Sequence, residues 1–177
     1  MICGTLTASG NQVLIRAMDY SDLDSVIQIE KSSFPHPWTR DHFISELQRD
    51  TVSRCYVAVT ADNKGTDPVD PCCGEGRISG YLMAWHVADE LHITNLAVSP
   101  EVRRRGIAVA LLRHSLKEAA EAGAIWCQLD VRTSNAPARE LYGQLGFKPF
   151  GIRKGYYRDG EDAVVMGKDL KNLIPGT

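Results

Sequence analysis

Three consecutive arginines precede a glycine in the stretch NLAVSPEVRRRGIAVALLR, residues 95–113. The arginines at 103–105 stand near the predicted start of a helix, where the helix dipole already places partial positive charge. The first amides of a helix lack partners within the helix, and Gly106 and Ala108 leave room for a ligand close to the backbone. A bound phosphate would reverse the repulsion between the arginines and the dipole. The motif therefore favours an anion site, with a solvated basic patch as the alternative.

A second set of side chains could move protons. Asp130 lies at the end of a predicted strand, and His92 lies on the strand that precedes it in the sheet. Either could serve as a base, Asp130 directly or through a water, and a histidine has a reference pKa near ~6.5. The alternatives are a structural histidine and a carboxylate paired with Arg132. Tyr142 could donate a proton, because a phenol with a reference pKa near ~10 is protonated at neutral pH; its alternative is a core tyrosine.

Composition limits the classes of protein to consider. The chain has 177 residues, of which 44% are hydrophobic and 24% charged, which is typical of a soluble globular protein, and we expect residues 1–177 to form a single domain. A formal net charge of -2 argues against general binding to nucleic acid. The apolar runs are too short to cross a bilayer, and the N-terminus lacks the pattern of a signal peptide. The sequence therefore predicts a cytoplasmic protein without a membrane partner.

The five cysteines do not indicate a metal site. They stand at positions 3, 55, 72, 73 and 127, with no C-x-x-C pair. An odd number without that spacing predicts neither a disulfide framework nor a zinc site. Cys55 and Cys127 fall in apolar, strand-like runs and are expected to be core thiols.

Apolar periodicity predicts the elements that must position these side chains. The run across 90–131 is strand, helix (105–122) and strand, which implies a right-handed crossover between parallel strands. Residues 78–87 and 90–98 read as an antiparallel hairpin. Residues 61–77 are rich in Gly, Pro and Asp, which predicts a loop insertion. The whole order, β-α-α-β-β-β-α-β-α-β-β, indicates an α/β (α+β) layer fold.

The segment LDVRTSNAPARELYGQLGF, residues 129–147, supplies a second motif. With residues 103–108 it resembles the GCN5-related N-acetyltransferases (GNAT), whose acetyl-CoA site joins R/Q-x-x-G-x-G/A to N-x-x-A-x-x-x-Y-x-x-x-G-F. The RimI-like branch, the ribosomal-protein-alanine N-acetyltransferases, resembles the chain over nearly its whole length, including FPHPWT, NLAVSPEVRRRGIA and IRKGYYRDGEDAVVMGKDL. The chain departs from that branch at Ala108, where glycine is commoner, at Asp130, where glutamate is usual, and in the 61–77 insertion.

The resemblance implies a fold, a reaction and a set of site residues. The fold would be a central mixed, mostly antiparallel sheet with one parallel, splayed strand pair, flanked by helices. The reaction would move acetyl from acetyl-CoA, without a metal, to the N-terminal alanine of a small-subunit ribosomal protein. The residues implied to bind acetyl-CoA are Leu96, Ala97, Val98, Arg103, Arg104, Arg105, Gly106, Ile107, Ala108, Val109 and Asn135.

The remaining roles also follow from the resemblance. Tyr142 matches the position that donates a proton to the CoA thiolate, Asp130 matches the base, and His92 is the other candidate base. Trp38, Tyr156 and Tyr157 match segments that flank the acceptor groove. Two other functions stay open: acetylation of a small amine or lysine side chain, and non-catalytic binding of acyl-CoA.

Overall fold

The computed structural model describes residues 4–8, 11–61 and 76–173. Most of the predicted 61–77 insertion, together with Cys3, Cys72 and Cys73, lies outside these residues. Of the two cysteines within them, Cys127 is buried and Cys55 half-buried, and both are free thiols. Burial raises the pKa of Cys55 to about 12 and also raises that of Cys127, so both behave as the core thiols expected.

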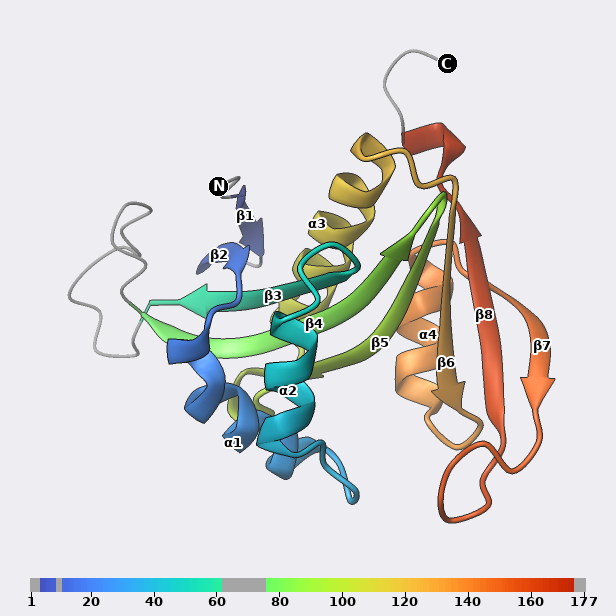
Figure 1. The fold of residues 1–177 in the computed structure, drawn as a ribbon, viewed down its shortest axis with the longest axis horizontal. Coiled ribbons are helices and arrows are strands. Elements are labelled where there is room, and N and C mark those ends of the chain that lie inside the picture. Colours follow the sequence, from blue (N-terminus) through green and yellow to red (C-terminus); the bar gives the residue numbers. More distant parts are fainter. Residues whose placement is uncertain (1–3, 9–10, 62–75, 174–177) are drawn as a thin grey trace. The chain divides into compact units, whose positions relative to one another are not determined.

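Strands and helices alternate largely as the sequence predicts (Figure 1). The strands are β1 (Gly4–Ala8), β2 (Asn11–Ala17), β3 (Ser53–Thr60), β4 (Arg77–Val87), β5 (Glu90–Val98), β6 (Trp126–Arg132), β7 (Lys148–Arg153) and β8 (Ala163–Asp169). The α-helices are α1 (Leu23–Ser33), α2 (Arg40–Leu47), α3 (Ile107–Glu121) and α4 (Ala136–Gln144), with short 3-10 turns at Tyr20–Asp22, Pro100–Val102 and Lys171–Leu173.

The hydrogen-bonded order of the strands is β1-β2-β3-β4-β5-β6-β8-β7. β5 and β6 are parallel, and their register covers four residues of each strand, from Glu90 opposite Trp126 to Ile93 opposite Leu129. The pairs β1–β2, β2–β3, β6–β8 and β7–β8 are antiparallel. The crossover from β5 through α3 to β6 thus gives the parallel pair that the sequence predicts, within a mixed and mostly antiparallel sheet.

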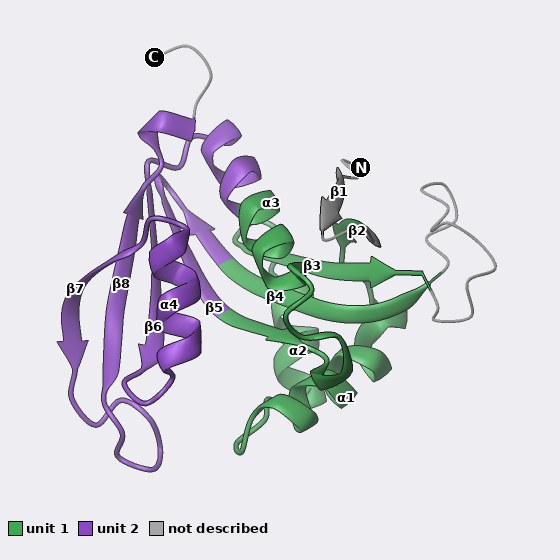
Figure 2. Ribbon diagram, turned by 180° about the vertical axis from the view of Figure 1, so that it is seen from behind, with its two compact units in different colours: residues 1–84, 95–115 green, residues 85–94, 116–177 purple. Residues whose placement is uncertain are grey.

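The chain forms two compact units, coloured separately in Figure 2. Unit 1 comprises Met1–Ala84 and Asn95–Ser115. In it, α1 and α2 lie on one face of the strands and the first part of α3 on the other. The apolar sides of α1 and α2 pack on β2, β3 and β4 around Phe43, which is fully buried and meets the Tyr81 ring edge-on at 5.6 Å. On the α3 side, the rings of Tyr56 and His114 meet at 4.9 Å.

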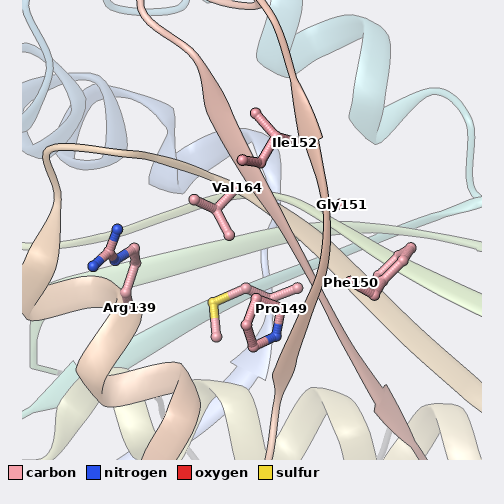
Figure 3. A pocket seen from close by; sticks show the side chains of 7 residues that line it. Arg139, Pro149, Phe150, Gly151, Ile152 and Val164 are labelled. Atoms are coloured by element: carbon pink, nitrogen blue, oxygen red, sulfur yellow. The ribbon is translucent and has the colours of Figure 1, made fainter.

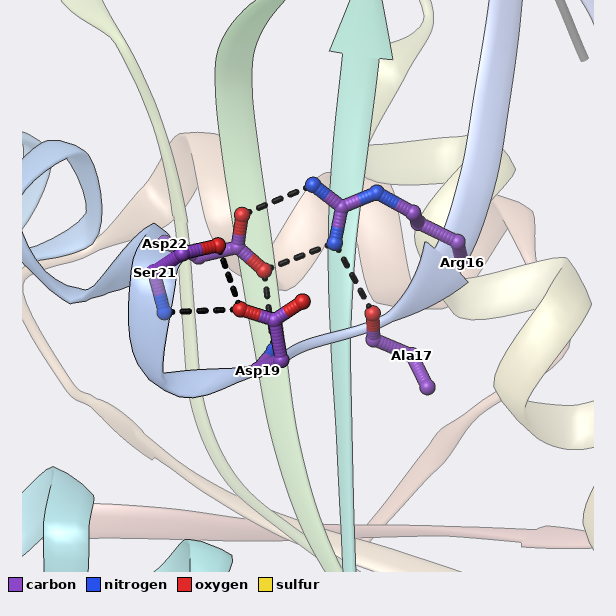
Figure 4. Close-up of polar contacts among 5 residues, drawn as sticks. All are labelled: Arg16, Ala17, Asp19, Ser21 and Asp22. Atoms are coloured by element: carbon purple, nitrogen blue, oxygen red, sulfur yellow. Dashed lines mark hydrogen bonds and ion pairs between the residues drawn. The ribbon is translucent and has the colours of Figure 1, made fainter. Parts of the chain in front are cut away.

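A buried ion pair fixes the start of α1 in unit 1 (Figure 4). Asp22 is 3% exposed and accepts two hydrogen bonds of 2.7 Å from the Arg16 guanidinium, and a third of 2.9 Å from the Asp19 amide. Asp19 in turn accepts a hydrogen bond from the Ser21 amide at 2.7 Å. These contacts join the end of β2 to the beginning of the helix.

Unit 2 comprises Trp85–Thr94 and Leu116–Thr177. Here α4 covers one face of β6, β7 and β8 (Figures 1 and 2). α4 begins at Asn135, whose side chain accepts a hydrogen bond from the Ala138 amide at 3.2 Å, and proline stands in its first turn. It ends before Gly146, which has a φ of +87° and lets the Phe147 amide reach the Tyr142 carbonyl at 3.0 Å.

Candidate active site

The arginines precede α3 and are not part of it. The helix begins at Ile107 and not near Arg105 as predicted, and residues 103–106 form a turn. Arg104 has a φ of +63° and Gly106 one of +80°, both in the left-handed region that stops a right-handed helix. The conflict between three cations and the helix dipole is thereby reduced, because the side chains leave a turn before the helix starts.

The start of α3 presents unpaired backbone donors. The Gly106 carbonyl accepts the first helical hydrogen bond, from the Ala110 amide at 2.9 Å. Within the residues that the structure describes, no hydrogen bond leaves the amides of Ile107, Ala108 and Val109. Three free amides at the positive end of a 15-residue helix can bind an anion, with Arg104 and Arg105 exposed beside them. The site therefore suits a phosphate group.

Arg103 makes hydrogen bonds within the described part of the protein, unlike the exposed Arg104 and Arg105. Its Nε donates to the Val98 carbonyl at 3.1 Å, and its guanidinium donates to the Ser33 hydroxyl on α1 at 3.1 Å. It therefore ties the turn to the end of β5, where Ala97 and Val98 are buried and Leu96 is half-buried. Gly80 on β4 allows this packing, since a Cβ there would lie 2.9 Å from the Ala97 carbonyl oxygen. The sequence analysis did not single out Gly80.

The two candidate bases contact each other in unit 2. His92 Nε2 on β5 lies 3.3 Å from Asp130 Oδ2 on β6, and the Asp130 side chain is only 7% exposed. Residue 92 stands opposite residue 128 in the parallel register, two positions before Asp130. The His92 ring also meets Trp85 edge-on, with centroids 6.0 Å apart. These contacts fix the orientation of the imidazole.

Asp130 pairs with residues other than Arg132, the partner that the alternative to a base had assigned to it. Its Oδ1 accepts a hydrogen bond of 2.9 Å from Arg153 Nε on β7, and its Oδ2 lies 3.3 Å from His92 Nε2. Both carboxylate oxygens are thus engaged, which favours His92 and Asp130 acting as a pair over Asp130 acting alone. Arg153 was not identified from the sequence, because its partner lies 23 residues away on a different strand.

Tyr142 lies on the inner side of α4. It is 9% exposed and its ring packs at 62° to Phe147, with centroids 5.9 Å apart. Burial is the main cause that raises its pKa above the ordinary value of 10.0. The phenol therefore keeps its proton throughout the neutral range, as a proton donor must.

Arg132 holds the loop that carries Tyr156 and Tyr157. Its guanidinium donates to Asp159 at 2.8 Å and to Glu161 at 2.7 Å, and it stacks 3.9 Å from the centroid of the Tyr157 ring. The two tyrosine rings meet edge-on at 5.2 Å, with Tyr156 half exposed. Burial raises the pKa of Tyr157 to about 12. The loop therefore presents neutral aromatic groups beside Asp130.

Trp38 lies in unit 1, in the segment between α1 and α2. Its ring packs against Phe43 and His42, with centroids 5.6 and 6.0 Å away. Its amide donates to the Glu30 carboxylate at 2.7 Å. Glu30 lies on the apolar side of α1 together with Val26. Helical spacing in the sequence places Glu30 on that side, but it does not identify Glu30 as part of a site.

A cavity of about 620 Å³ lies elsewhere in unit 2 (Figure 3). It is lined by Arg139, Pro149, Phe150, Gly151, Ile152, Val164 and Met166, none of which is a predicted site residue.

Among the described residues, no group of three or more His, Cys, Asp or Glu side chains could hold a metal ion. In the same part of the chain, no helix has the length and apolar character needed to span a membrane.

Comparison with known proteins adds independent findings. Residues 23–147 match the family described as "Acetyltransferase (GNAT) family". The Bacillus subtilis protein "Putative [ribosomal protein bS18]-alanine N-acetyltransferase" is 39% identical to this chain over 153 residues. The match covers 86% of this chain and 92% of that protein. An N-alpha-acetyltransferase of Saccharolobus solfataricus is 33% identical over 162 residues, covering 91% and 95%. The crystal structure of the ribosomal-protein-S18-alanine N-acetyltransferase from Escherichia coli has a TM-score of 0.74 at 30% identity, covering 89% of this chain and 94% of that one.

Proposed function

Because the chain belongs to the GNAT acetyltransferase family, we propose that it transfers acetyl from acetyl-CoA to the N-terminal α-amine of a protein. The proposed acceptor is the N-terminal alanine of a small-subunit ribosomal protein, and the reaction is proposed to take place in the cytoplasm. The observation that carries the proposal is the 39% identity over 153 residues to a relative with that named activity. We also propose that both units belong to one acetyltransferase domain, since the family match at 23–147 extends across both.

The free amides at the start of α3 support the proposed binding of acetyl-CoA. The pyrophosphate would accept hydrogen bonds from Ile107, Ala108 and Val109, with Arg104 and Arg105 supplying positive charge. Gly106, with its positive φ, brings the backbone to the phosphates without a side chain in the way. The backbone of residues 96–98 would contact the pantetheine arm, and Asn135 would bind the cofactor while it caps α4.

Proton transfer in the proposed reaction has a donor and an acceptor. The amine nitrogen forms a bond to the thioester carbon and gives up one proton, which the pair of His92 and Asp130 takes directly or through a water. The carbon–sulfur bond breaks, and the departing thiolate takes the proton of the Tyr142 hydroxyl. An α-amine with a reference pKa near ~8 is deprotonated far more readily at neutral pH than a lysine near ~10.4. This difference favours a protein N-terminus over a lysine side chain as the acceptor.

Trp38, Tyr156 and Tyr157 are the proposed contacts to the acceptor peptide. Tyr156 is half exposed and stands next to Asp130, so a peptide against its ring would place its amine near the proposed base. Aromatic rings bind a peptide backbone with little demand on its side chains.

The proposed reaction is tested by acetyl transfer to a panel of acceptors. The panel contains an alanine-initiated peptide, an N-terminally blocked lysine peptide and a polyamine, and mass spectrometry locates the acetyl group. Acetylation of the α-amine of the first peptide is expected. Transfer only to lysine or polyamine would refute the acceptor, and CoA binding without transfer to any member would indicate a non-catalytic protein.

The cofactor site is tested by placing a carboxylate in front of the free amides. Gly106→Glu should abolish CoA binding in calorimetry, because its charge and bulk occupy the phosphate position. Gly123→Glu is the matched control, since Gly123 also has a positive φ, +98°, and a Cβ added there would meet no atom within 4 Å. Equal loss of binding in both variants would show that backbone strain and not the phosphate site is responsible.

A further inference from the structure

A buried carboxylate in unit 1 joins three separate segments. Glu30, near the end of α1, is 1% exposed. Its Oε1 accepts the Trp38 amide at 2.7 Å, and its Oε2 accepts the Tyr81 hydroxyl from β4. The Asn95 side-chain amide on β5 lies 3.4 Å from both oxygens. One side chain thus meets the segment between the helices and two strands of the sheet.

The partners of Glu30 are all neutral donors. Within the described residues, no Lys, Arg or His forms an ion pair with it. A buried charge without a cation is costly, and a neutral amide of similar size would fill the same space at a lower cost. Hydrogen bonds to an ionised acceptor are roughly twice as strong as those between neutral groups. The carboxylate therefore binds its donors more strongly than a neutral group of the same size would. Packing alone would not require a charge at this position.

The donors that Glu30 binds belong to segments proposed to contact the two substrates. Trp38 carries a ring proposed to contact the acceptor peptide, and its backbone amide is the atom that Glu30 binds. Asn95 directly precedes Leu96, where the backbone proposed to contact the acetyl-bearing arm begins. Tyr81 is fully buried, and burial, then the nearby Glu30 charge, raise its pKa, so it stays a neutral donor.

We propose that Glu30 is a positioning residue for acetyl transfer, which fixes the Trp38 backbone relative to the cofactor-binding end of β5. This proposal rests on the proposed function. Glu30 touches neither substrate, because it is buried beneath both segments. Its loss should weaken acceptor binding while acetyl-CoA still binds to the free amides of α3.

The test compares Glu30→Gln with a control that alters a carboxylate of similar burial. Asp22→Asn neutralises a buried acid at the other end of α1, where the carboxylate binds Arg16 and the Asp19 amide (Figure 4). In steady-state kinetics, Glu30→Gln should raise KM for the alanine-initiated peptide about tenfold, as loss of one charge-assisted hydrogen bond predicts. KM for acetyl-CoA should stay within about twofold of wild type. Asp22→Asn should leave both KM values unchanged.

Further measurements keep the inference testable whatever the acceptor proves to be. Hydrogen exchange at the Trp38 amide should be faster in Glu30→Gln than in wild type and in Asp22→Asn. Tyr81→Phe, which removes one donor and leaves the carboxylate in place, should shift the same quantities less. Failure of wild type to acetylate the peptide would refute the proposed function alone, and the exchange rate would then decide the role of Glu30. Unchanged exchange at Trp38, or equal rises in both KM values, would overturn the inference.

Discussion

Asp130→Asn changes the charge at the proposed base with little change in shape. The carboxylate lies 2.9 Å from Arg153 Nε and 3.3 Å from His92 Nε2. The amide that replaces it fills the same volume, and Arg153 can turn to water because its side chain is 48% exposed. Because the Asp130 side chain is only 7% exposed, the free energy of unfolding should fall by about 1 to 2 kcal/mol, the usual cost of weakening a buried hydrogen bond.

The effect on the reaction should be larger than the effect on stability. When His92 takes a proton from the amine, the resulting imidazolium faces the Asp130 carboxylate at 3.3 Å. Coulomb's law gives about 1 kcal/mol for this attraction in a water-like medium and about 5 kcal/mol at an effective dielectric of 20. A value between these limits corresponds to a loss of about 10²-fold in kcat/KM, which is also usual for removal of a general base.

Steady-state kinetics of three variants on one alanine-initiated peptide would test this reasoning. If Asp130 acts through His92, then Asp130→Asn and His92→Gln should cost about the same, and the double variant should cost little more than either. If Asp130 is the direct base, Asp130→Asn should be the severe change and His92→Gln a mild one. Wild-type kcat/KM in both single variants would refute the role of the pair and leave solvent as the acceptor of the proton.

Three further predictions follow from the same contacts. Tyr142→Phe should lower kcat about 10²-fold with CoA affinity unchanged, measured by kinetics and calorimetry. Wild-type turnover in this variant would show that Tyr142 is a core residue and not the proton donor. The Ser134 amide, then Arg132, hold the pKa of Glu161 below its ordinary 4.5, so this carboxylate stabilises the loop above that pH and the contribution is lost as pH falls through the lowered value. In Arg132→Gln, an NMR titration should show the Glu161 midpoint moving up toward 4.5, and no movement would contradict the contact. Asp22→Asn should lower the free energy of unfolding by about 3 kcal/mol in denaturant titration, since it removes the negative charge of the buried pair with Arg16; a change under about 0.5 kcal/mol would contradict that.

The sequence predicts the order of elements because apolar spacing is a local property. The parallel pairing of β5 and β6 follows from the crossover rule and is confirmed by the register that begins at Glu90 and Trp126. The start of α3 was predicted two residues early, because propensity does not show that Arg104 and Gly106 adopt positive φ. β1 was not predicted at all, since Gly4–Ala8 is only five residues long.

Motif spacing supplied the candidate site residues, whereas the partners of these residues could not be predicted. Tyr142 and the arginines at 103–105 were proposed because their motif spacing is fixed within one segment. The alternative to a base at Asp130 paired it with Arg132, two residues away, whereas the structure pairs it with Arg153 on another strand. Glu30 was missed as a site residue for the same reason, since its donors at Tyr81 and Asn95 lie 51 and 65 residues away. The roles of these side chains in acetyl transfer stay predictions.

The position of Glu30 between Trp38 and Asn95 has a thermodynamic consequence for the two substrates. Acetyl-CoA bound along residues 96–98 would restrain Asn95, and the shared carboxylate would extend that restraint to Trp38. Binding of one substrate would then raise the affinity for the other, and linkage requires the factor to be the same in both directions. The cooperativity between the two substrates would thus depend on a single buried carboxylate that neither of them touches.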